Sequence, residues 1–151
     1  MFKHLLLLIF VPAFVYGQGT NVRTCTGYRP PPHEVRVRGC TSMPCTVRRG
    51  TEAIMDLEFT TPVSSNTLRP VVFASVLGAT IEYPLPDHLQ NACNHIRPNG
   101  CPLAAGTTTS YNFVFAVNPL YPPVTVGVEV NLLNQDNVAV TCFIVDIAVR
   151  F

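Results

Sequence analysis

The residues whose chemistry stands out first are six cysteines: Cys25, Cys40, Cys45, Cys93, Cys101 and Cys142. An even set of this kind is typical of disulfides formed in an oxidising compartment, although spacing alone leaves 15 connectivities for six cysteines. Cys40 and Cys45 are close enough to enclose a small loop, and turn-forming residues separate Cys93 from Cys101. Cys25 and Cys142 are then left to pair across most of the chain.

Thiolates also bind zinc, and His95 lies close to Cys93 in the sequence. The spacings nevertheless lack the paired Cys-x-x-Cys units that structural zinc sites use. We therefore expect neither a metal nor a cofactor.

No catalytic motif accompanies these cysteines. The chain lacks a Gly-x-Ser-x-Gly turn, a glycine-rich phosphate loop and a His-Glu-x-x-His pair. His33, His88 and His95 lie next to Pro, Asp or Asn in expected loops, where surface histidines are ordinary. Glu82 and Glu129 lie between apolar residues on expected strands and should face outward, the alternative being that one anchors the polar end of a ligand. We predict that the protein is not an enzyme.

The first 17 residues resemble a signal peptide. Lys3 and His4 precede an apolar run, and Val15-Tyr16-Gly17 suits cleavage before Gln18. The alternative, a membrane anchor, is not favoured because about 11 apolar residues fall short of the roughly 20 that a span needs. We predict a signal peptide over 1–17 and one domain over 18–151.

Charge argues against a nucleic-acid partner. Lys3 is the only lysine among the ten basic residues, which leaves nine arginines against nine acidic residues after the leader. Binding to phosphates needs a clustered cationic excess. Four arginines do cluster in sequence, at Arg36, Arg38, Arg48 and Arg49. The favoured interpretation is a solvated strand face, and the alternative is a patch for an anionic headgroup.

The rest of the chain is organised as short strands. Apolar residues alternate with polar ones, proline and glycine interrupt every interval, and no segment after the leader has a sustained helical period. The pattern predicts an all-β protein of two sheets packed face to face. The expected strands centre on Val35–Val37, Met55–Phe59, Val71–Leu77 (the most deeply buried), Ile81–Tyr83, Tyr111–Val117, Val124–Val130 and Val138–Val149.

Tyr111–Val117 and Val124–Val130 each place their apolar residues on one face. The connection between them, 118–123, contains three prolines that exclude regular pairing and hold Leu120 and Tyr121 in an extended segment. These residues could form a closed core or the wall and rim of a pocket.

The order of the cysteines, together with four short segments, resembles the ML lipid-recognition family, which includes the secreted Niemann-Pick type C-two sterol carriers and the mite group-two allergens. The resemblance extends from Cys25 to Val149. It rests on Gly39–Gly50, on Tyr83-Pro84-Leu85-Pro86 before Cys93, on Cys101-Pro102-Leu103, and on Tyr121-Pro122 before Cys142.

The resemblance implies an immunoglobulin-like two-sheet β-sandwich with a lipid cavity between the sheets. It implies the disulfides Cys25–Cys142, Cys40–Cys45 and Cys93–Cys101. The implied ligand-binding residues are Ile81, Tyr83, Phe115, Val117, Tyr121, Pro122, Val130, Phe143 and Val145, with Tyr83, Val117, Tyr121 and Pro122 near the entrance. The chain departs from the family at Val130 and Phe143, where sterol carriers often have tryptophan, and we expect this to change the pocket's volume.

We therefore expect a secreted, non-enzymatic protein that binds and transfers a sterol, a fatty acid or a similar hydrophobic molecule. One alternative is an extracellular recognition module for microbial lipids or chemical signals, and another is a protein-contact sandwich with a filled core. We expect a monomer that contacts a membrane or receptor transiently and does not bind nucleic acid. The expected location is extracellular, or endolysosomal after uptake, although no Asn-x-Ser/Thr site supports a glycan-dependent lysosomal route.

Overall fold

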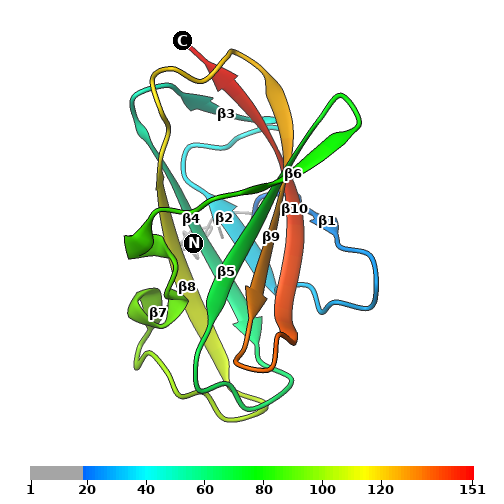
Figure 1. Cartoon of the computed structure of the whole chain (residues 1–151), viewed down its shortest axis with the longest axis vertical. Coiled ribbons are helices and arrows are strands. Elements are labelled where there is room, and N and C mark those ends of the chain that lie inside the picture. The colour runs from blue at the N-terminus through cyan, green and yellow to red at the C-terminus, as the bar shows by residue number, and fades with distance from the viewer. Residues whose placement is uncertain (1–18) are drawn as a thin grey trace, which may run out of the picture.

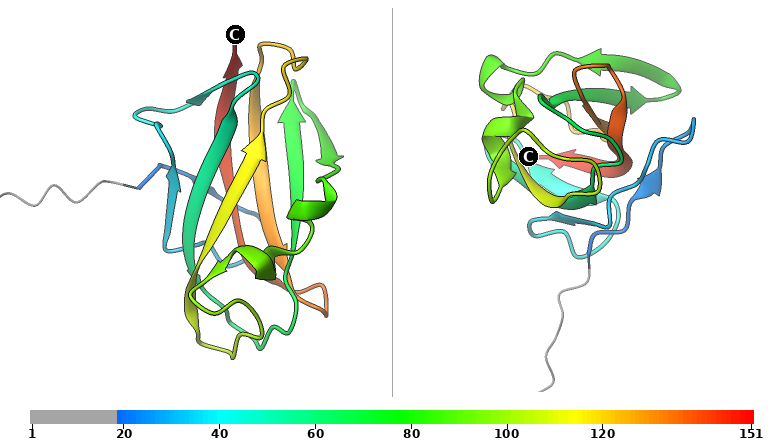
Figure 2. Two further views of the ribbon diagram at one scale, coloured as in Figure 1. Left: turned by 90° about the vertical axis from the view of Figure 1, so that its left-hand side faces the viewer. Right: turned by 90° about the horizontal axis from the view of Figure 1, so that it is seen from below.

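The computed structural model describes residues 19–151, so the predicted signal peptide and its cleavage site lie outside the described residues. Two β-sheets pack face to face, as predicted (Figures 1 and 2). The larger sheet contains β1 (Arg23–Thr24), β3 (Cys45–Arg48), β5 (Arg69–Val76), β6 (Ala79–Tyr83), β9 (Thr125–Leu133) and β10 (Ala139–Arg150). The smaller sheet contains β2 (Glu34–Val37), β4 (Glu52–Thr60), β7 (Ile96–Arg97) and β8 (Thr108–Ala116).

The larger sheet has the order β1-β10-β9-β5-β6, and β3 joins it by pairing in parallel with β10. The smaller sheet has the order β2-β4-β8-β7. Two short 3-10 helices, η1 (Asp87–Leu89) and η2 (Ala92–His95), lie in the connection that passes from β6 to β7 and so from one sheet to the other. No helix in the described part of the chain has the length and apolar character needed to span a membrane.

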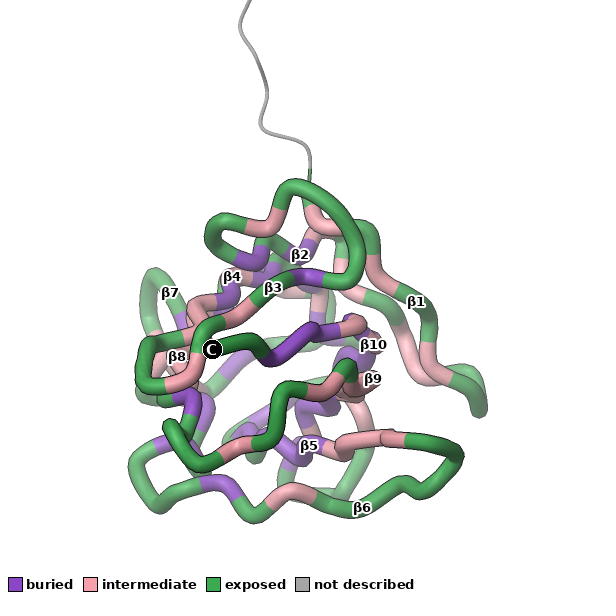
Figure 3. Tube along the Cα trace, turned by 90° about the horizontal axis from the view of Figure 1, so that it is seen from above, coloured by how far each residue is buried: buried purple, intermediate pink, exposed green. Residues whose placement is uncertain are grey.

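The alternation of apolar residues determines which face of each strand is buried. Met55 and Leu57 on β4 lie opposite Phe113 and Tyr111 on β8, and all four side chains are buried. The view in Figure 3 shows buried residues gathered between the sheets and exposed residues around the outside. A large part of the core is therefore the set of side chains that period-two alternation predicts.

The prediction for Val71–Leu77 is wrong in its second half. Val71 and Val72 are buried, but Leu77 is fully exposed at the tip of the β5–β6 hairpin. Pairing between β5 and β9 ends at Ser75 and Gly127, and beyond it β5 pairs only with β6. The hairpin consequently projects past the sandwich, as Figure 1 shows.

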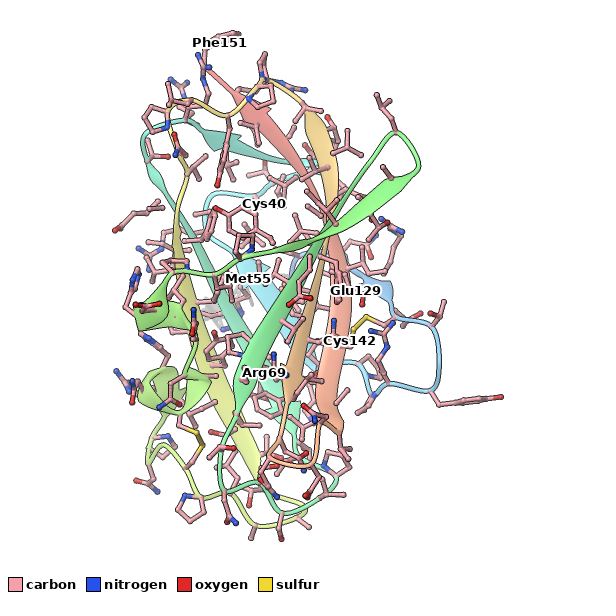
Figure 4. The ribbon with its side chains drawn as sticks, viewed as in Figure 1. Cys40, Met55, Arg69, Glu129, Cys142 and Phe151 are labelled. Carbon is pink, nitrogen blue, oxygen red and sulfur yellow. A yellow bond between two sulfur atoms is a disulfide. The ribbon has the colours of Figure 1, made fainter. Side chains whose placement is uncertain are left out.

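The three disulfides implied by the resemblance are present, and none of the cysteines within 19–151 is free. Cys25 follows β1 and bonds to Cys142, which is fully buried in β10 (Figure 4). Antiparallel pairing of β1 with β10 brings these two cysteines together although 117 positions separate them. This bond therefore fastens the N-terminal edge strand to the last strand.

Candidate ligand-binding cavity

An apolar cavity of about 310 Å³ lies between the two sheets. Side chains from β4 and β8 form one side, those from β5, β9 and β10 form the other, and the connection from β8 to β9 contributes its edge. Every lining residue is aliphatic, aromatic or methionine, and none of those that the structure describes is charged. The interior is therefore only partly filled by its own side chains, unlike a closed protein core.

The cavity occupies one end of the sandwich, the end that carries the C-terminus. On β10, Ile147 and Val149 line it, and on β9 Val126 and Val128 do. Other residues on these same faces, nearer the opposite end of the sandwich, are fully packed in the core. The same face of a strand is thus cavity wall at one end and core at the other.

This division separates the predicted ligand-binding residues into two groups. Six of them line the cavity: Ile81, Tyr83, Phe115, Val117, Tyr121 and Pro122. The other three, Val130, Phe143 and Val145, do not line it, because they lie further along β9 and β10, where the interior is filled. The expected departure from the family at Val130 and Phe143 therefore concerns the core beneath the cavity and not its wall.

Several lining residues were not among the ligand-binding residues that the resemblance implied. Phe113, Val126 and Val128 lie on the two apolar faces that could have formed either a closed core or the wall of a pocket, and the structure places them in the cavity wall. Val47 carried no such signal, because it reaches the cavity only through the parallel pairing of β3 with β10. That pairing joins two strands that are far apart in the sequence.

A chain of aromatic rings runs along the cavity to its rim. Phe113 stacks on Phe115 with ring centroids 6.2 Å apart, and Phe115 meets the edge of Tyr83 at 5.4 Å. Tyr83 then meets Tyr121 edge to face at 6.4 Å, and their hydroxyl groups are hydrogen-bonded. These contacts fix ring orientations by quadrupole complementarity as well as by apolar burial.

The rim lies where the lining residues become exposed. Ile81 is 65% exposed and Pro122 is also exposed, whereas Tyr121 is half-buried. Val117, predicted near the entrance, is only 4% exposed and belongs to the wall. The cavity thus opens between β6 and the connection from β8 to β9.

The proline-rich connection is held in place by local hydrogen bonds. The main-chain N–H of Tyr121 donates to the carbonyl of Asn118 at 3.1 Å, and the side-chain oxygen of Asn118 accepts from the N–H of Leu120 at 2.8 Å. The N–H of Gly50 donates to the carbonyl of Val117 at 2.7 Å. Gly50 has a φ of 74°, a conformation that glycine adopts without strain.

The predicted arginine cluster does not form one patch. Arg36 forms an ion pair with Glu34 on β2, in the smaller sheet. Arg48 ends β3 in the larger sheet, where Arg150 is its neighbour on β10. Arg49 contacts the rim residue Tyr121. Arg38 directly follows β2 and is exposed, so the four arginines are divided between the two sheets and the cavity rim.

The candidate acid and imidazole groups lie away from the cavity. Glu82 is exposed, and His33 contacts Thr60 on β4. Glu129 was predicted to face outward, and it lies on the opposite face of β9 from the cavity-lining Val128, where it is partly covered: Arg29 donates to its carboxylate at 2.5 Å and Asn131 donates to it at 3.0 Å. Burial raises the pKa of Glu129, but the hydrogen bonds from Asn131 and Arg29 and the charge of Arg29 outweigh it, so the pKa is lowered. Glu129 has its own cationic partner and lies outside the cavity wall.

A tight cluster of potential metal ligands is formed by Glu129, Cys25 and Cys142. The two sulfur atoms are bonded to each other, so they are not thiolates that could coordinate a metal.

Comparison with known proteins shows similarity to one protein family. A family model described as "ML domain" matches residues 19–149. NPC intracellular cholesterol transporter 2 of Bos taurus is 26% identical over 145 residues, 95% of this chain and 94% of the relative. NPC intracellular cholesterol transporter 2 homolog a of Drosophila melanogaster is 30% identical over 110 residues, 72% of each chain. The fold is shared with a solved structure, the crystal structure of a Niemann-Pick type C2 protein from Japanese carpenter ant. The two superpose with a TM-score of 0.76 at 18% sequence identity, over 87% of this chain and 100% of that one.

Proposed function

The chain belongs to the ML-domain family, and from this membership we propose that it binds a hydrophobic small molecule in the cavity between its two sheets. Members of this family bind lipids without catalysing a reaction, so the prediction that the chain is not an enzyme is confirmed. The proposed ligand is a sterol, a fatty acid or a similar lipid.

The observation that carries this proposal is the apolar cavity of about 310 Å³ with no charged lining residue among those described. Burying roughly 400 Å² of an apolar ligand at about 25 cal/mol per Å² contributes about 10 kcal/mol. Association costs about 4 kcal/mol or more. Micromolar to nanomolar affinity is therefore attainable by apolar contact alone.

The finer proposal is a secreted carrier that takes its ligand from a membrane or fluid and releases it to a membrane or a receptor. The names of the bovine and Drosophila relatives, which are cholesterol transporters, support a sterol as the cargo. The three disulfides support passage through an oxidising compartment.

The test is to express the full chain in an oxidising, secreting host, extract the purified protein with organic solvent and identify the released molecules by mass spectrometry. We expect a lipid at up to one equivalent per chain, and uptake of a labelled sterol or fatty acid by the extracted protein. Failure of both would contradict the proposal. Transfer of the labelled lipid from donor to acceptor vesicles would distinguish a carrier from a recognition module, which would retain it.

A further inference from the structure

The disulfide between Cys25 and Cys142 has an acidic side chain beside it. The carboxylate of Glu129 lies within 4.8 Å of both sulfur atoms, and Figure 4 shows Glu129 and Cys142 close together on the larger sheet. Within residues 19–151, neither of the other two disulfides has a carboxylate placed in this way. The arrangement is therefore particular to the bond that fastens β1 to β10.

This cluster lies on the outer face of the larger sheet. Glu129 and Cys142 each alternate along their strands with residues whose side chains face the cavity or the core. The segment that follows β1 covers this face, and the main-chain N–H of Cys142 donates to the carbonyl of Pro30 at 2.8 Å. Cys142 is consequently fully buried, whereas Cys25 is half-buried.

The carboxylate of Glu129 carries a negative charge at neutral pH. Burial raises the pKa of Glu129, but the hydrogen bonds from Asn131 and Arg29 outweigh it, so the pKa is lowered. Both hydrogen bonds end on Oε1, which leaves Oε2 without a donor among the described residues. Arg29 also donates to the side chain of Asn131 and to the carbonyl of Thr26, so its guanidinium serves several acceptors. Negative charge therefore remains beside the two sulfur atoms.

Reduction of a disulfide begins when a thiolate attacks one of its sulfur atoms. An external thiolate attacks Cys25, the more exposed cysteine, forms a mixed disulfide with it and expels Cys142 as a thiolate that takes the electron pair. A second external thiolate attacks the mixed disulfide and releases Cys25 as a thiolate. The protein disulfide thus gains two electrons, and the two external thiols leave joined as a disulfide.

The charge of Glu129 acts against both halves of the first step. The incoming thiolate approaches a carboxylate of the same sign. Burial and a neighbouring negative charge also disfavour the thiolate form of a cysteine, and exchange is slower when the departing thiolate is less stable. The position of Glu129 should therefore slow the attack and the departure of Cys142 alike.

We propose that Glu129 protects the Cys25–Cys142 disulfide, by its charge, from reduction by small thiols. The protected bond keeps the edge strand β1 fastened to β10 when the surrounding fluid contains a reducing thiol. This inference is independent of the proposed function, because it concerns the outer face of the larger sheet and holds whatever the cavity binds.

The first test compares the reduction of each disulfide by 2-mercaptoethanol in the full chain and in its Glu129→Gln variant. Samples are quenched with N-ethylmaleimide, and peptide mass spectrometry measures the labelling of every cysteine. We expect the Cys25–Cys142 bond of the variant to be reduced roughly threefold to tenfold faster, because the departing thiolate loses a neighbouring like charge. The other two disulfides in the same samples should change by less than about twofold.

The charge of the thiol separates an electrostatic role from a packing role. Cysteamine carries an ammonium group and 2-mercaptoethanesulfonate carries a sulfonate, and each rate is divided by that of the same thiol with 2-hydroxyethyl disulfide. We expect a preference for cysteamine at Cys25–Cys142 that falls about threefold in Glu129→Gln and rises in Arg29→Gln. A looser structure would instead accelerate both thiols equally.

Asp146→Asn is the matched control. It neutralises another carboxylate of the larger sheet, which binds Arg23 of β1 at 2.6 Å but does not belong to the cluster around the sulfur atoms. The variant therefore shows what weaker attachment of β1 does by itself. Its Cys25–Cys142 bond should be reduced at a rate within about twofold of wild type.

Three results would overturn the inference. They are an unchanged rate in Glu129→Gln, equal acceleration in Glu129→Gln and Asp146→Asn, and an unchanged preference between the two charged thiols in Glu129→Gln. If Glu129→Gln does not fold, the wild-type protein decides: a preference for cysteamine that is no greater at Cys25–Cys142 than at the other two disulfides would also overturn it. None of these results bears on ligand binding in the cavity, which the lipid-extraction experiment tests.

Discussion

The guanidinium of Arg49 donates a hydrogen bond of 3.1 Å to the main-chain carbonyl of Tyr121, which lies 72 positions later in the chain. The same guanidinium lies 4.0 Å above the ring of Phe151, at the end of the sandwich that Figure 4 shows at the top. Arg49 therefore fastens the turn between β3 and β4 to the rim of the cavity. Arg49 has no acidic partner among the described residues, and these two contacts explain why it is nevertheless half-buried.

Replacing Arg49 with alanine should loosen the rim. We expect ligand to dissociate several-fold faster, because Tyr121 loses its link to the β3–β4 turn, while the free energy of unfolding falls by about 1 kcal/mol. Stopped-flow release of a fluorescent fatty acid measures the rate. Arg48→Ala is the control, since it removes the same charge without a contact to the rim, and equal effects of both variants would contradict this role for Arg49.

Enlarging Val117 should fill the cavity. Val117→Phe places a larger side chain in the wall, and we expect ligand affinity to fall at least tenfold with little loss of thermal stability, because the added atoms enter space that is empty in the ligand-free protein. Val114→Phe makes the same change on β8 at a residue that does not line the cavity. Binding to that control should stay within about twofold of wild type, and normal binding by Val117→Phe would show that the ligand occupies another site.

Phe143 and Phe115 should respond differently to truncation. Phe143 is fully buried in the core, so Phe143→Ala should lower the free energy of unfolding by about 3–5 kcal/mol. Phe115 lines the cavity and is only half-buried, so Phe115→Ala should cost roughly half as much stability and weaken ligand binding more. Urea denaturation and probe displacement measure the two effects. The reverse ranking in stability would contradict the division between core and cavity wall.

The ion pair between Arg29 and Glu129 should make stability depend on acid pH. Because the pKa of Glu129 is lowered in the native state, the unfolded chain takes up the proton first as the pH falls below the ordinary value of about 4.5. Stability should thus be complete above that pH and be lost as the pH falls through the native pKa. Urea midpoints measured across this window should fall less steeply for Glu129→Gln than for wild type. An identical slope would show that Glu129 makes no contribution.

Much of the fold could be predicted from the sequence because it depends on local patterns. Alternation at Met55–Phe59 and Tyr111–Val117 predicts strands with one apolar face, and the structure pairs these two segments in one sheet. The resemblance to the ML family implied the three disulfides that the structure contains. Reasoning from apolar pattern failed at Leu77. This residue lies beyond Ser75, the last residue of β5 that pairs with β9, so no second sheet covers its side chain.

The sequence alone therefore predicted the longer strands, their apolar faces and the cysteines available for pairing, since each of these follows from residue type and spacing, but it did not predict the short strands β1, β3 and β7. Only the tertiary structure decided where along those faces the cavity lies. Val145 and Ile147 share one face of β10, yet only Ile147 lines the cavity. The reason is physical: period two specifies the side of a sheet on which a side chain lies, whereas empty space depends on which side chains of the opposite sheet reach that level. The meeting of Tyr83 with Tyr121 was decided in the same way, by pairing between segments far apart in the chain.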